Sequence, residues 1–227
     1  MAHGISRRRF LAGAAGAGAG ALMGATPALA GRTTVEVICR QAWGARPPSG
    51  RFVRHTIERL TVHHSAVELT RDRDAPQRMR DHQAYHQSLG WPDIAYHLGI
   101  DRHGFIYELR PRWAKGDTNT DYDPRGHLQV LCEGDFGVQD PSARMVAALV
   151  DVLAWGCRRY DVPVYRIKGH RDHAATSCPG AGLYGLLRSG AIHRKVQRRL
   201  EAGGVWLEEI CGPAGRALVR DIEAGRA

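Results

Sequence analysis

The stretch IERLTVHHSA, residues 57–66, predicts a β-strand around which the rest of the domain can be arranged. β-branched and apolar residues predominate in it, which is typical of strands. Side chains alternate across a strand, so two sets lie on opposite faces: Leu60, Val62 and His64 on one, and Thr61, His63 and Ser65 on the other. The two adjacent histidines must therefore have different roles.

The segments on either side of this strand alternate between strand and helix patterns. Before it, residues 40–48 are expected to be an irregular segment. After it, the patterns predict a helix over 74–90, two strands within 91–111 joined by a turn at 101–104, and a long polar loop over 112–127. A strand over 128–136, a helix over 142–160, a strand near 164–167 and a short helix over 182–190 follow. One strand pair joined by a tight turn implies a mixed sheet. The sequence therefore predicts a single α/β domain with a central mixed β-sheet flanked by helices.

Two of the predicted helices show an inner face. The helix over 142–160 carries one wide apolar stripe, made of Met145, Val146, Leu149, Val150, Val152 and Leu153. In the helix over 74–90, Pro76 suits the first turn, and the expected inner residues are Met79, Tyr85, His86 and Leu89. The stripe of the helix over 142–160 is expected to lie on the sheet.

The first thirty residues resemble a twin-arginine export signal. SRRRFL at 6–11 precedes a weakly apolar Ala/Gly run and the small-residue site ALA at 28–30. An uncleaved membrane anchor is the alternative, although glycine and alanine gain little from hydrocarbon. We expect export to the periplasm or the cell exterior, a domain over 31–192, and a basic extension of two short helices over 193–227 with no interpretable motif.

The charge balance suits an anionic partner. Removal of 1–30 takes three arginines from 32 basic residues and leaves 29 against 23 acidic ones, a net charge of +6. The arginines are scattered among acids and are not interleaved with aromatic residues, which argues against nucleic acid. For an exported protein, the carboxylate-rich bacterial cell wall is the more natural partner, and the sequence leaves the oligomeric state open.

Five cysteines, an odd number, leave at least one outside any intramolecular disulfide. If Cys178 is bound to a metal, three pairings of the other four remain open, and two of these four could equally be small buried hydrophobes. The four are Cys39, Cys132, Cys157 and Cys211, of which Cys132 and Cys157 are the pair that could be buried thiols.

Three separated residues form a candidate metal site. Catalytic zinc usually takes three protein ligands from His, Cys and carboxylates, with the fourth position left for water. The candidates are His63 in the strand over 57–66, and His170 and Cys178 in GHRDHAATSCPG at 169–180. Each is weak evidence alone, because single buried histidines and Cys-Pro loops are commonly structural.

Five motifs in order resemble the peptidoglycan recognition protein and phage-type N-acetylmuramoyl-L-alanine amidase family. They are WGARPP at 43–48, TVHHSA at 61–66, GWPDIAYHLGI at 90–100, CEGDF at 132–136 and GHRDHAATSCPGAGLYGLL at 169–187. The resemblance implies that His63, His170 and Cys178 bind one Zn²⁺ ion and that Tyr96 is the catalytic tyrosine. Thr176 occupies a further catalytic position, two residues before the zinc cysteine.

The resemblance also implies the reaction. We expect a zinc-dependent amidase that cuts the amide between the lactyl group of N-acetylmuramic acid and the L-alanine of the stem peptide in peptidoglycan, with Tyr96 donating a hydrogen bond to the developing oxyanion. The loop over 112–127 lacks the Gly-x-His segment common in the family, so its substrate contacts cannot be carried over. Two alternatives stay open: a non-catalytic peptidoglycan-binding module with structural zinc, and a recycling enzyme for soluble anhydro-muropeptides.

Overall fold

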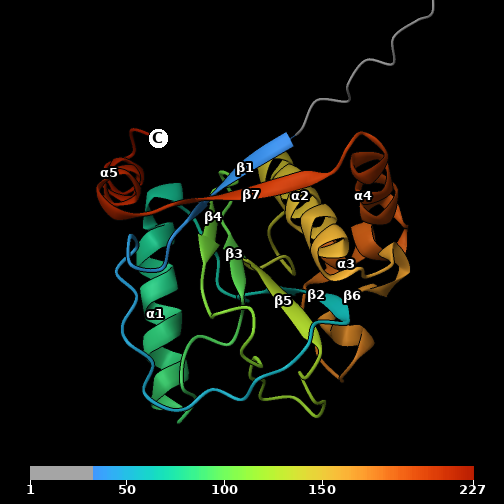
Figure 1. The fold of residues 1–227 in the computed structure, drawn as a ribbon, viewed down its shortest axis with the longest axis horizontal. Coiled ribbons are helices and arrows are strands. Elements are labelled where there is room, and N and C mark those ends of the chain that lie inside the picture. Colours follow the sequence, from blue (N-terminus) through green and yellow to red (C-terminus); the bar gives the residue numbers. More distant parts are fainter. Residues whose placement is uncertain (1–32) are drawn as a thin grey trace, which may run out of the picture.

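A single seven-stranded mixed sheet forms the centre of the computed structural model, which describes residues 33–227. Its strands lie in the order β6-β2-β5-β3-β4-β1-β7 (Figure 1). Their bounds are β1 Thr33–Ile38, β2 Arg59–His64, β3 Leu98–Ile100, β4 Ile106–Glu108, β5 His127–Cys132, β6 Ile167–Gly169 and β7 Val205–Ile210. Among the strands of residues 33–227, β3 and β4 pair antiparallel and the other neighbours pair in parallel, which confirms the expected mixed sheet.

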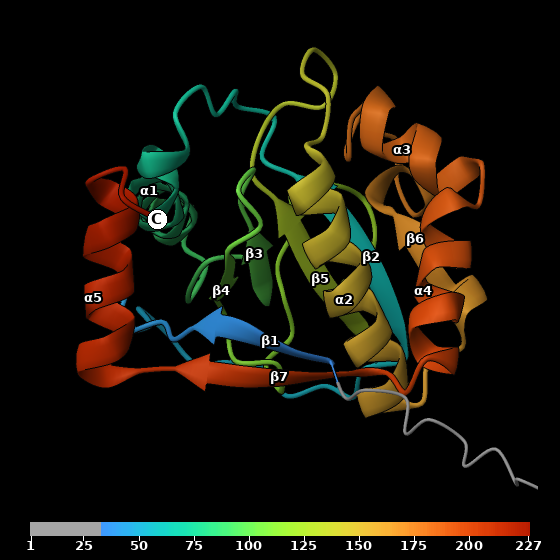
Figure 2. The same ribbon diagram turned by 90° about the horizontal axis from the view of Figure 1, so that it is seen from above.

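Helices cover both faces of the sheet (Figure 2). One face carries α1 (Ala75–Ser88) and α5 (Gly212–Glu223), and the other carries α2 (Ala143–Tyr160), α3 (Ala181–Arg188) and α4 (Ala191–Glu201). Each side has its own apolar core: Met79 and Trp43 are buried on the α1 side, and Leu149 and Leu153 on the α2 side. This is the α/β architecture predicted from the sequence.

Helix α2 follows its sequence pattern closely. The Ser142 side chain accepts a hydrogen bond from the Met145 backbone N–H at 3.0 Å and caps the helix N-terminus. All six residues of the predicted apolar stripe are buried. The stripe therefore places α2 against the sheet, as expected.

In helix α1, half of the predicted inner face is wrong. Pro76 lies in the first turn and Met79 and His86 are buried, as expected, but Tyr85 and Leu89 are 58% and 40% exposed. Met79 and His86 lie seven residues apart and share one face, whereas Tyr85 is turned away by one residue, or about 100°. Leu89 lies beyond the last helical residue, Ser88, where the helical periodicity no longer applies.

Residues 193–227 do not form only two helices, as the sequence suggested. Strand β7 lies between α4 and α5 and pairs in parallel with β1 along its whole length, from Thr33↔Val205 to Ile38↔Ile210. Neither strand was predicted. As the outermost strand, β7 is buried at Val205 and otherwise half-buried or exposed, so its sequence VWLEEI lacks the apolar run of a central strand.

The bounds of several predicted strands also need correction. The strand expected over 128–136 is β5, which ends at Cys132, and 133–136 are not part of a strand. Residues 164–166 form a 3₁₀ turn, and the strand β6 begins only at Ile167. The expected strand pair within 91–111 is reduced to β3 and β4, three residues each, because 91–97 run as irregular backbone. The turn between them, at 101–104, lies where it was predicted.

A disulfide joins Cys39 and Cys211, with Cα atoms 5.1 Å apart, at the carboxyl ends of β1 and β7. It resolves the pairings that the sequence left open. Cys132 and Cys157 are free thiols buried in the apolar core on the α2 side, which is the alternative role considered for them. The disulfide therefore fastens the outer strand pair across 172 residues of chain.

Within 33–227, none of the helices is both long enough and apolar enough to span a bilayer. The predicted signal over residues 1–30 lies outside the described residues.

Candidate metal centre

A cleft of about 340 Å³ opens at the carboxyl ends of the parallel strands β2 and β6. Open α/β sheets place ligand sites at this edge. The lining comes from four parts of the chain: the end of β2, helix α1 with the segment before β3, the loop over 112–127, and the loop after β6. The side chains of His63, Tyr96, Thr120, His170 and Cys178 all line it.

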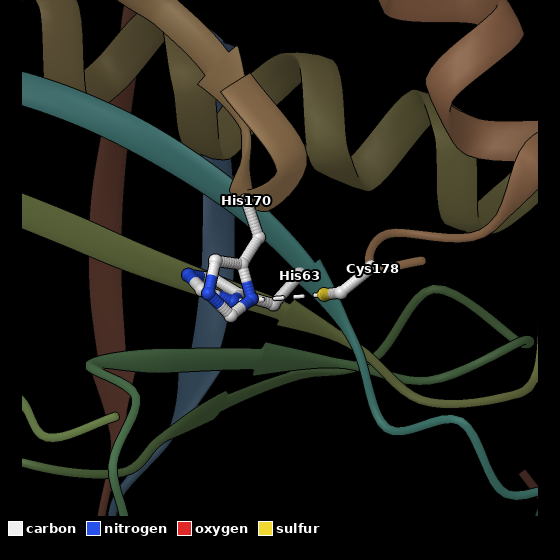
Figure 3. Close-up of side chains that lie close together, drawn as sticks. All are labelled: His63, His170 and Cys178. Atoms are coloured by element: carbon white, nitrogen blue, oxygen red, sulfur yellow. Dashed lines mark hydrogen bonds between the residues drawn. The ribbon is translucent and has the colours of Figure 1, made fainter. Parts of the chain in front are cut away.

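The three predicted metal ligands meet in this cleft (Figure 3). Strand register brings two of them together, because Val62 pairs with Gly169, the last residue of β6. His63 follows Val62 on β2, and His170 follows Gly169 at the start of a 3₁₀ turn. The rings of these histidines lie 4.6 Å apart between centroids. One ligand atom from each of His63, His170 and Cys178 lies within 4.8 Å of the others, so the group could hold a metal ion.

The third residue, Cys178, returns to the strands through a closed loop. The Arg171 backbone N–H donates to the Cys178 carbonyl oxygen at 2.9 Å, and the Arg171 guanidinium donates to the Ser177 carbonyl oxygen. Gly180 then turns the chain into α3 with φ at +84°, and a Cβ there would lie 2.4 Å from the Phe136 carbonyl carbon. Only glycine fits this turn, which holds Cys178 beside β2.

Burial controls the protonation of these three groups. It lowers the pKa of His63 well below the usual value for histidine and lowers that of His170 to about 4, so both imidazoles are neutral near pH 7 and can bind a metal. Burial raises the pKa of the Cys178 thiol to about 12, although the His64 backbone N–H at 3.3 Å favours the thiolate. A bound cation reverses that preference, since it favours the thiolate directly.

Two further observations fit a metal between these residues. The Cys178 sulfur lies 3.7 Å from His63 Nδ1, which is close enough for both to contact one ion. The other nitrogen, His63 Nε2, is buried and has no hydrogen-bond partner among the described residues. A buried imidazole nitrogen without a partner is costly unless an ion or a water binds to the ring.

Tyr96 lies beside this group, just before β3, with its ring centroid 5.1 Å from that of His63. Its hydroxyl has no hydrogen-bond partner within the described part of the chain, and the residue lines the cleft. Burial raises the pKa of Tyr96, so the phenol stays protonated and can donate. His97 points away and bridges the Gln129 backbone N–H and the Ala114 carbonyl, which agrees with a core role.

Thr176 lines the cleft, and its hydroxyl oxygen accepts a hydrogen bond from the Cys178 backbone N–H at 3.2 Å. Asp172, two residues after His170, accepts hydrogen bonds from the Gly169 N–H and the Tyr184 hydroxyl. His86 accepts a hydrogen bond from the Ala95 backbone N–H and supports the segment that carries Tyr96. The catalytic role of Thr176 stays a prediction.

The hydrogen-bond partner of His170 was not predicted from the sequence. Thr120 in the loop over 112–127 places its hydroxyl oxygen 2.7 Å from His170 Nε2. Tyr122 of the same loop packs its ring 5.2 Å from the His170 ring. These contacts join residues about fifty positions apart, and the only available signal was the unusual length and polarity of the loop.

A buried pair in the cleft wall was also missed. The Glu133 carboxylate follows β5, is fully buried, and lies 2.8 Å from Nε2 of His82 on α1. His82 lines the cleft. The motif CEGDF marked Glu133, but nothing in the sequence paired it with a helix residue fifty-one positions earlier.

The fold and the cleft define an α/β domain with a candidate mononuclear metal centre at the carboxyl edge of its sheet. The profile of the N-acetylmuramoyl-L-alanine amidase family (Amidase_2) matches residues 53–181, more than half of the sequence. The chain belongs to this family, which confirms the resemblance seen in the motifs. The disulfide, β1, α4, β7 and α5 lie outside the matched range.

The relatives include proteins named for recognition and proteins named for catalysis. Peptidoglycan-recognition protein LB of Drosophila melanogaster is 31% identical over 164 residues, 70% of each chain. The human N-acetylmuramoyl-L-alanine amidase is 31% identical over 172 residues, 72% of this chain and 29% of the relative. A solved variant of Drosophila PGRP-LB in complex with tracheal cytotoxin superposes with a TM-score of 0.60 at 28% identity, covering 67% of this chain and 93% of that one.

Proposed function

We propose that this protein is a zinc-dependent N-acetylmuramoyl-L-alanine amidase, which hydrolyses the amide between the lactyl group of N-acetylmuramic acid and the L-alanine of the stem peptide. The observation that carries the proposal is the convergence of His63, His170 and Cys178 in a cleft beside the free hydroxyl of Tyr96. Similarity to a named amidase and to a protein solved with a peptidoglycan fragment supports the substrate class.

The donor set suits zinc. Two neutral imidazoles and one thiolate give three ligands of the type found in catalytic zinc sites. Zn–S and Zn–N bonds of about 2.3 and 2.0–2.1 Å at tetrahedral angles separate sulfur and nitrogen by about 3.6 Å, and the separation between Cys178 Sγ and His63 Nδ1 is 3.7 Å. When bound, zinc activates water near neutral pH and polarises the scissile carbonyl.

The protein's own groups supply the remaining functions. Tyr96 donates its hydroxyl proton in a hydrogen bond to the carbonyl oxygen as that oxygen gains negative charge. The His64 backbone N–H donates to the Cys178 sulfur and stabilises it as a thiolate. Thr176, with its oxygen already accepting from the Cys178 N–H, can donate its proton into the cleft and orient the substrate or the attacking water.

A muropeptide assay tests the proposal. Purified protein with zinc should release free stem peptide from muropeptides, and a chelator should stop the release. Cys178→Ser should abolish turnover while a pull-down on cell wall continues. A zinc-loaded sample that releases no stem peptide would contradict the proposed amidase activity.

The same assay separates the alternatives. Similarity to proteins named for recognition favours a non-catalytic binding module with structural zinc, for which wild type and Cys178→Ser would bind cell wall without turnover. A recycling enzyme would cleave soluble anhydro-muropeptides and leave intact sacculi uncut. Equal cleavage of sacculi would contradict that role.

The proposal includes export through the twin-arginine pathway, supported by the arginines and small-residue site of 1–30. A reporter fused to this segment should leave the cytoplasm in cells with the twin-arginine translocase. Arg7→Lys with Arg8→Lys should retain it there. Retention of the unchanged fusion would contradict export.

A further inference from the structure

The loop over 112–127 contacts the metal centre through two threonines. Thr120 Oγ1 lies 2.7 Å from His170 Nε2 and 2.7 Å from Thr118 Oγ1. Thr118 Oγ1 also accepts a hydrogen bond from the Thr120 backbone N–H at 3.1 Å. The three groups form a continuous hydrogen-bonded chain that ends on one of the candidate ligands.

We infer that Thr120, supported by Thr118, is a positioning residue that fixes the ring orientation and tautomer of His170 for metal binding. The inference rests on the metal site of the proposed function. Metal-binding histidines normally donate their second ring N–H to an acceptor, and loss of that acceptor lowers the affinity for the metal. With Nε2 of His170 engaged by Thr120, Nδ1 is the nitrogen left for the ion.

The direction of the hydrogen bonds follows from this arrangement. His170 Nε2–H donates to Thr120 Oγ1, and the Thr120 hydroxyl donates in turn to Thr118 Oγ1. Thr118 Oγ1 can accept both this bond and the one from the Thr120 N–H, since a hydroxyl oxygen has two lone pairs. Tyr122 packs against the His170 ring from the same loop and limits its rotation.

A buried arginine holds the loop in place. The Arg110 guanidinium is fully buried and donates to the Asp117 carboxylate at 2.6 Å and to the Lys115 carbonyl at 2.5 Å. It also donates to the carbonyl oxygens of Asp93 and Ile94, both at 2.7 Å. One side chain therefore ties the loop just before Thr118 to the segment just before Tyr96.

The backbone of the loop passes close to that segment as well. A Cβ at Gly116 would lie 2.6 Å from the Ala95 carbonyl oxygen, so glycine is required for this approach. The path of the chain from Arg110 to Thr120 is thus set by charge, hydrogen bonding and close packing. A loop held in this way can supply a defined hydrogen bond to His170, as a freely moving one could not.

Zinc affinity of the purified protein, measured by competition with a chromophoric chelator, tests the inference. Thr120→Val keeps the side-chain shape, removes the acceptor, and should weaken zinc binding by about 10- to 100-fold. Thr120→Ser keeps the hydroxyl and should bind within about 3-fold of wild type, because only the methyl group is lost. Thr118→Val should cost about 2- to 10-fold, the worth of one hydrogen bond.

Thr34→Val, on the exposed outer part of β1, is the matched control and should bind zinc as wild type does. Cobalt substitution gives a readout independent of activity: the visible absorption bands should change in Thr120→Val and not in Thr120→Ser. Thr120→Val with wild-type zinc affinity and an unchanged cobalt spectrum would overturn the inference.

The outcome distinguishes this inference from the proposed function. A wild-type protein that binds zinc but cleaves no muropeptide would overturn the amidase proposal and leave the positioning role standing. A wild-type protein that binds no zinc would overturn both. If Thr120→Val fails to fold, Thr118→Val and Thr120→Ser still decide, since the first must weaken zinc binding and the second must not.

Discussion

Removal of the Cys39–Cys211 disulfide should destabilise the protein strongly without impairing the cleft. The bond joins the ends of β1 and β7, the two strands at one side of the sheet, whereas the candidate metal ligands lie on β2 and beyond β6 at the other side. The test variant replaces both residues, Cys39→Ser with Cys211→Ser. This variant should therefore be less stable than wild type while its zinc affinity stays nearly unchanged.

The magnitude follows from the length of chain that the bond closes. A separation of 172 residues gives about 5 kcal/mol at 25 °C in the chain-entropy treatment, and removal of native disulfides typically costs about 2–5 kcal/mol. The parallel pairing of β1 with β7 remains in the variant. It cannot replace the contribution of the disulfide, because the disulfide acts by lowering the conformational entropy of the unfolded chain. We expect a loss of about 3–5 kcal/mol in the free energy of unfolding.

Urea unfolding at fixed zinc concentration measures this loss, with zinc held constant because a bound metal itself stabilises the folded state. Wild type treated with a thiol reductant should match the double variant, and the reductant should not alter the double variant further. Zinc affinity at 25 °C should stay within about 3-fold of wild type. A difference in unfolding free energy below about 1 kcal/mol would refute the reasoning.

Three further predictions concern the cleft and its supports. Tyr96→Phe should lower kcat by about 10²- to 10³-fold with zinc content unchanged, because it removes the donor to the developing oxyanion, and unchanged kcat would contradict that role. Burial lowers the pKa of His97 to about 3, so its contribution to stability is present above pH 6.5 and is lost as pH falls toward 3. In His97→Gln, the urea midpoint of unfolding should therefore fall less steeply with decreasing pH over that range. A slope equal to that of wild type would contradict the role given to His97. Gly180→Ala, with φ at +84° and a Cβ 2.4 Å from backbone, should cost about 2 kcal/mol or more by urea unfolding.

Local sequence patterns predicted the parts of the fold that depend on local physics. The apolar stripe of α2 is buried at all six predicted positions, and the helix lies within the predicted range of 142–160. The alternation in 57–66 correctly gave the two histidines different roles: His63 belongs to the candidate metal group, whereas His64 Nδ1 accepts from the Phe136 backbone N–H at 3.3 Å. These features arise within one element, so neighbouring residues were enough to predict them.

The missed features depend on pairings between distant residues. Strand β7 is stabilised by β1 from the other end of the chain, and its own sequence, VWLEEI, shows neither strict alternation nor an unbroken apolar run. The choice of Cys39 with Cys211 among the open disulfide pairings follows from that same pairing. Likewise, Thr120 acquires its role only because the folded loop brings it to His170.

The candidate metal centre combines these two kinds of information, and this explains why its ligands were found and its supports were not. His63 and His170 lie one step beyond paired residues on adjacent parallel strands, so the register of the sheet alone brings them together. Cys178 needs a closed loop with a required glycine, and that loop carries a motif that the sequence displays. The groups that contact His170 from outside come from a third region, over 112–127, and no pattern within that region pairs Thr120 with His170.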